Sequence, residues 1–497
     1  FKLQTSNFKL YICCRHNNAF YLMKKQPARS LPRRRFLKNA GLAAAGFYIV
    51  PRAVLGGKGY TAPSDRLNIA LVGVGGKGSA HLSAVKNQRW AAFCDVDDRR
   101  AADAYRAHPE VPRFRDFREM LDKAGKDIDA VMVTTPDHTH AVIALAAIQL
   151  GKHVYVEKPL THNIAEARQL LAASKQYKVV TQMGNQGASM DCNAEVAEWI
   201  QAGVIGKVNR VHIWTNRPVW PQGVPTPKDG ESVPPELDWN LWLGPAPLRP
   251  YSERYLPFRW RGWWDFGTGA LGDMGCHLID PVYRALQLTY PSSIEASATT
   301  VWSGDFFEAD YPDSCPPSSI VKMEYPARAG MPACELLWYD GGVRPMRPAE
   351  LGANEPFGSW DGGVLFEGSK GKMMCGIYGE DATLLPTVKM KDFKKPKIVL
   401  PRYKDSHQMV WVNACKGEGQ ASSPFEYAVP LTEAILIGNL AVRCYDIKKL
   451  QAGKTPQSWA PYDYPGRVRL EWDAANMRVT NFEEANRFVQ REARSGW

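Results

Sequence analysis

The stretch Leu67-Asn68-Ile69-Ala70-Leu71-Val72-Gly73-Val74-Gly75-Gly76-Lys77-Gly78 decides the fold of the first half of this 497-residue chain. Its apolar beginning predicts a short buried strand, and three glycines then follow at the spacing G-x-G-x-x-G. Residues 76–87 continue in a pattern typical of a helix. A glycine turn between a buried strand and a helix is the context in which this spacing binds a dinucleotide.

Each part of the turn has a predicted role in holding the pyrophosphate of such a cofactor. Gly73 permits the tight turn, Gly75 lets the backbone approach the pyrophosphate, and Gly78 lets the helix pack on the strand. The first N–H groups of the helix and its positive dipole end face the phosphates. The predicted contacts are Gly73, Val74, Gly75, Gly76, Lys77 and Gly78. The alternative is a strand–helix turn that binds no ligand.

An acidic residue closes the next predicted strand, residues 90–95. Asp95 follows Gly73 by 22 residues, the place from which a carboxylate hydrogen-bonds the adenosine ribose hydroxyls. Because its charge would repel a 2′-phosphate, NAD is predicted in preference to NADP. Arg99 and Arg100 lie nearby and favour the opposite choice.

Strands and helices alternate over residues 65–184, which predicts a doubly wound domain. The strands are short apolar runs without alternation, as in a parallel sheet that helices cover on both faces. After residue 185 come a Pro- and Trp-rich stretch, 216–268, several alternating strands and a helix over 431–450. We predict an α/β fold: an N-terminal doubly wound (Rossmann) parallel-sheet domain, followed by a C-terminal α+β domain, 185–497, with a mainly antiparallel sheet.

The net charge of +11 is concentrated near the N-terminus. The first 60 residues contain 12 Lys or Arg and no Asp or Glu, which leaves 50 basic and 51 acidic residues in the remainder. A nucleic-acid-binding domain needs a basic face, so no nucleic-acid partner is predicted. The cysteines and histidines show no metal-ligand spacing, so no metal site is predicted, and disulfide pairing stays open.

Residues 1–64 are predicted to be an extension that contains an export signal. Arg33-Arg34-Arg35-Phe36-Leu37-Lys38 resembles the twin-arginine motif, and an apolar stretch, 39–50, follows it. That stretch is shorter than the ~20 residues that span a bilayer, so we expect export to the periplasm and no stable membrane span beyond the signal. An uncleaved signal would act as a tether. Residues 1–22 are interpreted as an upstream translation artefact.

Three further motifs lie behind the glycine turn. They are Thr134-Thr135-Pro136-Asp137-His138-Thr139-His140, Glu157-Lys158-Pro159 and Gly272-Asp273-Met274-Gly275-Cys276-His277. Together with the turn they resemble the Gfo/Idh/MocA family, named after glucose–fructose oxidoreductase, inositol dehydrogenase and a rhizopine-catabolism protein. The resemblance covers about residues 65–450 and implies nicotinamide-dependent redox chemistry on sugars, polyols and their derivatives. Carried over by position, it implies that Lys158, Asp273 and His277 are catalytic.

The residue types support the same chemistry. If residues 270–286 form a helix, Asp273 and His277 lie one turn apart on one face. Oxidation of an alcohol needs a base for the hydroxyl proton, and the ordinary pKa of His277 suits that task. Asp273 would orient the imidazole or bind a neighbouring hydroxyl, while Lys158 would stabilise the alkoxide or share the proton transfer. The alternative is an exposed capping or salt-bridge pair.

Residues after the strand ends are also predicted to contact the cofactor. Glu157 is expected to position the loop of Lys158, and His138 or His140 either contacts the nicotinamide end or caps a helix. The predicted contacts beyond the turn are Asp95, Thr134, Thr135, Pro136, His138, His140, Glu157 and Lys158.

Seven of the 16 Trp fall between residues 214 and 264. Flat aromatic faces suit the C–H faces of sugars, and plain packing is the alternative. Arg261, Trp263 and Trp264 lead into the stretch of Asp273 and are predicted to line the substrate site.

We therefore predict an NAD(P)-dependent oxidoreductase that acts on CH–OH groups of a sugar, polyol or glycoside with tightly bound NAD. One alternative is a glycosidase or lyase that oxidises, eliminates and reduces on a recycled NAD. Export favours it, because free NAD is scarce outside the cytoplasm. Another is a non-catalytic binding protein on a dehydrogenase scaffold. The C-terminal sheet is the expected surface for a homo-oligomer.

Overall fold

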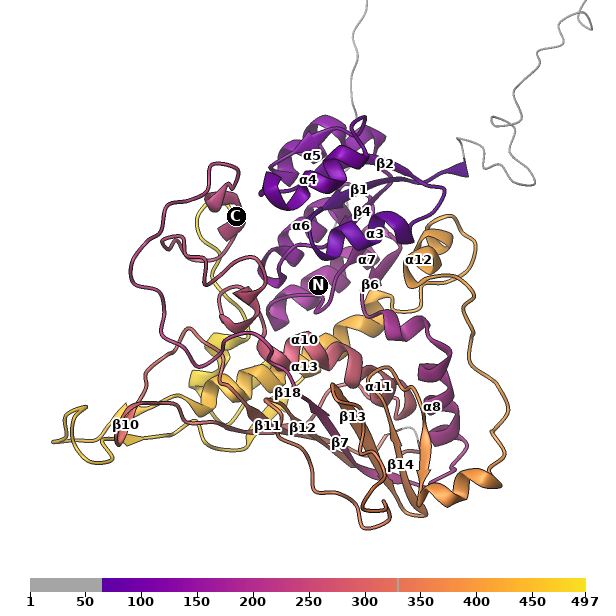
Figure 1. The fold of residues 1–497 in the computed structure, drawn as a ribbon, viewed down its shortest axis with the longest axis vertical. Helices are drawn as coiled ribbons and strands as arrows, with labels where there is room; N and C mark the ends of the chain where they lie inside the picture. The colour runs from indigo at the N-terminus through magenta and orange to yellow at the C-terminus, as the bar shows by residue number, and fades with distance from the viewer. Residues whose placement is uncertain (1–64, 329) are drawn as a thin grey trace, which may run out of the picture. The chain divides into compact units, whose positions relative to one another are not determined.

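The computed structural model describes residues 65–328 and 330–497. The predicted export signal and the suspected artefact at residues 1–22 lie outside the described residues. The described part contains two large sheets, each with its own helices (Figure 1).

Six parallel strands form the first sheet, in the order β3-β2-β1-β4-β5-β6. Alternate residues of β1 pack into two different apolar clusters, so both faces of the sheet are buried, as expected for a parallel sheet. The order reverses between β1 and β4, and ligands bind at the carboxyl ends of strands at such a point. The strands are β1 (Asn68–Val72), β2 (Arg89–Cys94), β3 (Arg113–Phe114), β4 (Ala130–Val133), β5 (His153–Val156) and β6 (Thr181–Met183). Their helices are α3 (Lys77–Ala84), α4 (Asp98–Ala107), α5 (Phe117–Ala124), α6 (Asp137–Gln149) and α7 (Ile164–Tyr177).

Nine strands form the second sheet, in the order β15-β14-β13-β7-β12-β11-β8-β18-β19. All neighbours are antiparallel except β7 and β12, which run parallel. The strands are β7 (Val208–Thr215), β8 (Ser293–Ala298), β11 (Ser319–Tyr325), β12 (Cys334–Tyr339), β13 (Gly362–Gly368), β14 (Gly371–Cys375), β15 (Thr383–Leu385), β18 (Leu470–Asp473) and β19 (Arg478–Val479). The predicted fold class, a doubly wound parallel sheet followed by a mainly antiparallel one, is therefore confirmed.

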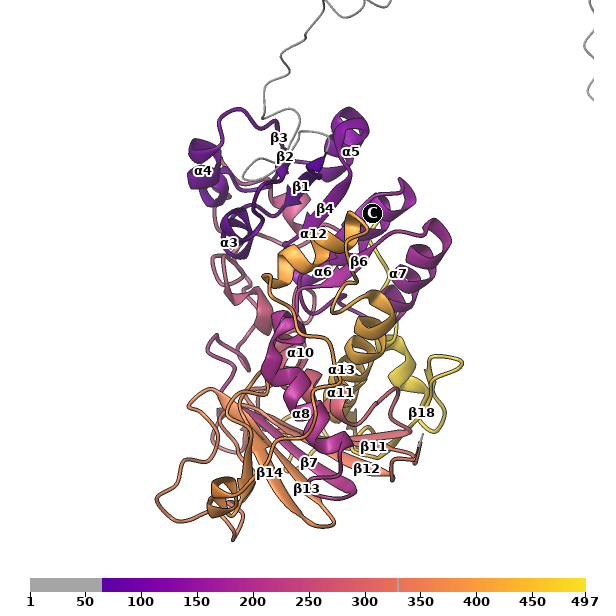
Figure 2. The same cartoon turned by 90° about the vertical axis from the view of Figure 1, so that its right-hand side faces the viewer.

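Two helices connect the sheets. The first is α13 (Phe425–Tyr445), which packs against α7 on one side and against β8 and β11 on the other, and the second is α10 (Gly269–Leu278), which packs on α13. Both views show α10 and α13 between the two sheets (Figures 1 and 2). Among the described residues, α13 alone is long and apolar enough to cross a membrane, and 83% of its apolar window is buried inside the protein. The other helices of this half include α8 (Asp191–Gln201), α9 (Trp239–Leu243) and α12 (His407–Cys415).

Two helices differ from the predicted ones. Residues 270–286 form α10 and a separate helix, α11 (Asp280–Ala285), because Pro281 lacks the N–H that would continue α10. Helix α13 begins at Phe425 and passes through Pro430, whereas the prediction started it at residue 431. Burial of nearly every side chain around Pro430 outweighs the lost backbone hydrogen bond.

Ile435 tests the central place of α13. Its side chain is fully buried against Gly275 of α10, so Ile435→Ala is expected to lower the free energy of unfolding by about 2–5 kcal/mol. Urea unfolding followed by Trp fluorescence measures the loss. The matched control is Ile398→Ala, because the Ile398 side chain is 64% exposed and its removal should cost less than about 0.5 kcal/mol. Equal losses in the two variants would contradict this packing.

Candidate active site

A cavity of about 1100 Å³ opens at the carboxyl ends of the parallel strands. Residues of the glycine turn, the ends of β4 and β5, helix α10 and the segment 217–261 line it. This volume exceeds the roughly 300–1,000 Å³ of an ordinary small-molecule site, so it leaves room for a dinucleotide and a small substrate together.

The glycine turn lies in the cavity wall as the sequence predicts. Gly73, Gly75, Gly76 and Lys77 line the cavity. A Cβ on Gly73, where φ is +85°, would lie 2.8 Å from the backbone of the β4 end, and a Cβ on Gly78 would lie 1.9 Å from the Gly73 carbonyl oxygen. Larger residues would therefore separate α3 from the sheet. Helix α3 has no acidic residue in its first turn, which leaves its N-terminus free for an anion.

Asp95 follows the end of β2 and borders the same cavity. Its carboxylate accepts hydrogen bonds from the N–H groups of Gly75 and Asp97, both at 3.0 Å, and burial raises its pKa. Arg99 is held by Asp97 at 2.8 Å, so one of the two cations that favoured NADP is already paired. Arg100 also borders the cavity.

Lys158 and Asp273 form the ion pair at the centre of the site. The Lys158 Nζ donates to Asp273 Oδ1 at 2.9 Å and to the Asp273 carbonyl at 2.8 Å, and Arg261 Nε donates to the same Oδ1 at 3.0 Å. Burial opposes both charges, but each partner stabilises the other: the pKa of Asp273 is lowered and that of Lys158 is raised. Both groups are therefore charged at neutral pH.

Glu157 lines the cavity and is held by a buried hydrogen bond. Gln408 donates to His81 Nδ1 at 3.1 Å, which leaves His81 Nε2 to donate to Glu157 Oε1 at 3.0 Å. Burial opposes ionisation, but the bond from His81 outweighs it and lowers the pKa of Glu157 to about 2. Glu157 is 5% exposed and directly precedes Lys158. The bond from His81 therefore fixes the backbone next to Lys158.

His277 lies on α10, one turn after Asp273, and lines the cavity. Asp273 bonds the two cations and not the imidazole, so the first of its two predicted roles, to orient His277, is not seen among the described residues. Burial, together with the positive charge of Lys158, lowers the pKa of His277 to about 3. The imidazole is neutral and a weak base, so the prediction based on its ordinary pKa needs correction.

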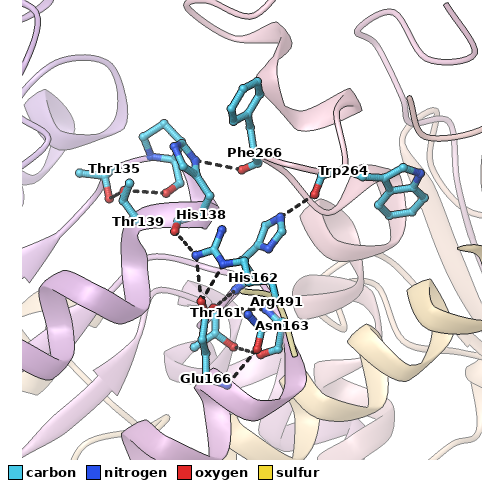
Figure 3. A network of polar contacts seen from close by, with 11 residues as sticks. Thr135, His138, Thr139, Thr161, His162, Asn163, Glu166, Trp264, Phe266 and Arg491 are labelled. Carbon is cyan, nitrogen blue, oxygen red and sulfur yellow. Dashed lines mark hydrogen bonds and ion pairs between the residues drawn. The ribbon is translucent and has the colours of Figure 1, made fainter. Parts of the chain in front are cut away.

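His138 and His140 do not line the cavity. His138 Nε2 lies 2.9 Å from the Trp242 carbonyl and Nδ1 lies 3.3 Å from that of Phe266, and the ring nitrogens of His140 lie 2.8 Å from two other backbone carbonyls. Arg491 bonds the His138 carbonyl from the C-terminal segment (Figure 3). Burial lowers the pKa of His138 to about 3. The prediction that His138 or His140 contacts the cofactor is therefore wrong, because neither residue lines the cavity and their rings bond backbone carbonyls.

The tryptophans at the cavity differ from those we predicted. Trp263 is 2% exposed and donates to the Arg254 carbonyl, and Trp264 packs in the main apolar core, so neither lines the cavity. Arg261 does line it, stacked with its guanidinium 4.2 Å from the Trp260 ring centre. The aromatic residues that line the cavity are Phe117, Trp220, Trp242, Tyr251, Phe258, Trp260 and Trp497.

Many residues that line the cavity were not predicted from the sequence, and Asp137 and Trp497 are two of them. Asp137 belongs to the motif of residues 134–140, and its place after a strand end was a usable signal. Trp497 lines the cavity from the C-terminal segment, which returns to the first half of the fold. No local pattern indicates that contact.

Two family models match this chain. Residues 67–185 match the oxidoreductase family Gfo/Idh/MocA, NAD-binding Rossmann fold, and residues 200–303 match the C-terminal alpha/beta domain of that family. Both halves of the chain are therefore similar to the two domains of Gfo/Idh/MocA oxidoreductases.

Curated relatives match over part of their length. A levoglucosan dehydrogenase of Pseudarthrobacter phenanthrenivorans is 28% identical over 44% of this chain and 50% of that protein. A glycosyl hydrolase family 109 protein of Shewanella pealeana is 27% identical over 36% and 44%, and an inositol 2-dehydrogenase of Salmonella typhimurium is 29% identical over 29% and 45%. The chain thus spans about half the length, or less, of these relatives.

Solved structures show the same fold. The WlbA dehydrogenase from Bordetella pertussis, in complex with NADH and UDP-GlcNAcA, gives a TM-score of 0.52 at 16% identity and covers 76% of this chain and 96% of that chain. The WlbA dehydrogenase from Chromobacterium violaceum gives the same TM-score and identity and covers 76% and 94%. At this identity the likeness concerns the fold alone.

Glu157→Gln tests the buried pair with His81. Because the folded pKa of Glu157 is about 2, below its ordinary value near 4.3, its charge stabilises the fold above about pH 4.3, and this stabilisation is lost as the pH falls toward 2. We expect the variant to be about 3 kcal/mol less stable at pH 7 and the difference to narrow between about pH 5 and pH 3. Urea unfolding at several pH values measures it. A pH-independent difference would contradict an ionised, bonded Glu157.

Proposed function

We propose that the protein is an NAD-dependent oxidoreductase that transfers hydride between the cofactor and a hydroxyl group of a sugar, polyol or glycoside. One observation carries the proposal: the glycine turn and Asp95 line the same cavity as Lys158, Asp273 and His277. The names levoglucosan dehydrogenase and inositol 2-dehydrogenase, which two relatives bear, agree with such a substrate.

The residues present suit NAD. The turn presents Gly75, Gly76 and Lys77 to the cavity at an uncapped helix start, where a pyrophosphate finds free N–H groups. Asp95 would accept hydrogen bonds from the ribose hydroxyls on its remaining lone pairs and would repel a 2′-phosphate. Bound NAD supplies the hydride acceptor for the alcohol carbon.

The centre of charge lies where an alkoxide would develop. Lys158 is protonated and fixed by Asp273, so it can stabilise negative charge on the substrate oxygen. The neutral His277 would hydrogen-bond the same or a neighbouring hydroxyl. Arg261, stacked on Trp260, would bind further hydroxyls or an acidic substituent of the substrate.

The proposal includes tightly held NAD, and a segment that lines the cavity beside the end of β2 supports it. We define residues 236–245 as the strap. Asp98 N–H donates to the Glu236 carbonyl at 3.2 Å and Asp238 N–H donates to the Val96 carbonyl at 2.9 Å, directly after the strand end that carries Asp95. Release of a bound cofactor on this side would require these bonds to open.

The C-terminal segment holds the strap in place. Arg494 donates to the Asn240 side chain at 2.7 Å and to its carbonyl at 2.6 Å. Arg118 of α5 donates to the Gly496 carbonyl at 3.1 Å and stacks on Trp497 at 4.4 Å. The segment therefore connects the strap to the parallel-sheet half.

A second candidate function follows from a retained cofactor. Glycosyl hydrolase family 109 proteins are among the relatives, and a glycosidase or lyase that oxidises, eliminates and reduces on one NAD needs no free cofactor. Net accumulation of NADH supports the dehydrogenase, whereas glycoside cleavage at constant cofactor state supports this alternative. A protein that never binds NAD would contradict both and leave the binding-protein interpretation.

Export and assembly are also proposed. The basic N-terminal segment with its twin arginines supports export to the periplasm, and an exported enzyme gains most from a retained cofactor. The exposed face of the C-terminal sheet, which includes Ile320 and Lys322 of β11, is the proposed contact between subunits.

Lys158→Ala tests the hydride chemistry. Wild-type protein with NAD is incubated with levoglucosan, myo-inositol and alkyl glucosides, and absorbance of the reduced nicotinamide is followed. We expect the variant to lower the rate by about 10²–10³, because the alkoxide loses its cation. Lys404→Ala, an exposed lysine outside the cavity, is the control and should keep the rate. Full activity of Lys158→Ala would overturn the site assignment.

Arg494→Ala tests cofactor retention. Removal of its bonds to Asn240 loosens the strap, so NAD should dissociate about tenfold faster, which corresponds to about 1.4 kcal/mol. The time course of NAD loss during dialysis measures the rate. Arg478→Ala, which removes an exposed ion pair with Glu483, is the matched control. If all three proteins lose NAD at one rate, the strap does not retain it.

A further inference from the structure

Oxidation of an alcohol releases a proton, and the three predicted catalytic residues are poorly suited to take it. Lys158 is already protonated, and the Asp273 carboxylate is paired with two cations that lower its pKa. His277 is buried, neutral and a weak base. A general base works best when its pKa lies near the working pH, so another group should serve.

Asp137 lines the same cavity and is the first residue of α6, at the end of β4. It is 3% exposed, so water does not surround its carboxyl group. Its Oδ2 accepts a hydrogen bond from the Thr268 hydroxyl at 2.7 Å. Its Oδ1 has no hydrogen-bond partner among the described residues, and other atoms do not fully enclose it. Because Asp137 lines the cavity, this free oxygen borders it.

The hold on Asp137 is built into the start of α10. Thr268 precedes that helix, and its carbonyl accepts from Asn439 Nδ2 of α13 at 2.8 Å. A Cβ on Gly272 would lie 1.9 Å from the Thr268 hydroxyl oxygen, so only glycine lets this hydroxyl point toward Asp137. The glycine that precedes Asp273 in the motif thus fixes the position of a second carboxyl group.

The groups around Asp137 come from several elements. His140 is on its own helix, Arg261 and Asp273 face it from the second half, and the Cys276 and Cys315 thiols lie near it, kept neutral because burial raises their pKa. Burial raises the pKa of Asp137 to about 6, while His140, Thr268 and Arg261 limit the rise.

We propose that Asp137 accepts the proton that the substrate hydroxyl loses while its carbon gives hydride to NAD. The C–H electron pair goes to the nicotinamide, the O–H proton goes to Asp137 Oδ1, and a carbonyl forms. The reverse reaction returns both. The inference rests on the proposed function, and it assigns the base without His277. Capping of α6 is the competing role, since an acid in the first turn stabilises a helix.

Asp137→Asn tests the two roles, because the amide keeps the size and the bond from Thr268 but cannot take a proton. Wild-type kcat/KM, measured with whichever of levoglucosan, myo-inositol or an alkyl glucoside reduces NAD, should fall tenfold per pH unit below about 6. Asp137→Asn should be about 10²–10³ slower than the wild type, and its kcat/KM should not fall at low pH. Asp137→Glu should restore part of the rate and part of this pH dependence. NAD affinity, read from protein fluorescence, should change by less than about threefold.

Asp340→Asn is the matched control. Asp340 is also a buried carboxyl whose pKa burial raises to about 6, but it binds Ser319 and Trp338 and does not line the cavity. Infrared spectra of the substrate-free protein provide a readout without turnover. Asp137→Asn and Asp340→Asn should each lose one buried carboxyl band that titrates near pH 6. In the wild-type protein, NAD should shift the band assigned to Asp137 and leave the band of Asp340 unchanged.

The outcomes separate the two proposals. If no hydroxyl compound reduces NAD, the proposed function fails, and the infrared titration still tests Asp137. If NAD is reduced and Asp137→Asn keeps both the wild-type rate and the fall of kcat/KM at low pH, the proton-acceptor role is wrong. It is also wrong if NAD does not shift the carboxyl band of Asp137. If His277→Ala loses the fall at low pH and Asp137→Asn keeps it, His277 is the base.

Discussion

The carboxylate of Asp273, shared by Lys158 and Arg261, is the interaction on which the site depends. Lys158 comes from the end of the parallel sheet, Asp273 from α10, and Arg261 from the tryptophan-rich segment, so one oxygen atom joins three parts of the chain. Without it the two partly buried cations would repel each other, and removal of one member of such a pair is costly. The interaction also determines the chemistry, because it keeps Lys158 charged and contributes, through that charge, to the weak basicity of His277.

Helix α10 has a second role beside carrying Asp273. Its first turn holds Asp137 through Thr268, and α13 holds Thr268 through Asn439. The core helices, together with the ends of the sheet strands, therefore position the groups that line the cavity. On another side of the cavity, Leu241 of the strap and Trp497 of the C-terminal segment form part of the wall.

Local patterns predicted the parts that local chemistry determines. The glycine turn, the strand that ends in Asp95 and the motifs with Lys158 and Asp273 all border the cavity, because each is fixed by a strand or helix end. The pKa of His277 could not be predicted, since it depends on burial by distant residues. The orientation of His138 depends on carbonyls more than 100 residues away in sequence, and the choice between Trp260 and Trp263 depends on how an irregular segment folds. Arg494 and Trp497 had no sequence signal for the same reason.

Native mass spectrometry of the protein as purified tests the central claim, that this cavity is built to retain NAD, most directly. The account predicts one NAD per chain, retained through extensive washing and released as intact NAD or NADH on denaturation. A protein that is purified without a nucleotide and gains no mass when NAD is added would contradict it. Retention of NADP in its place would contradict the role given to Asp95.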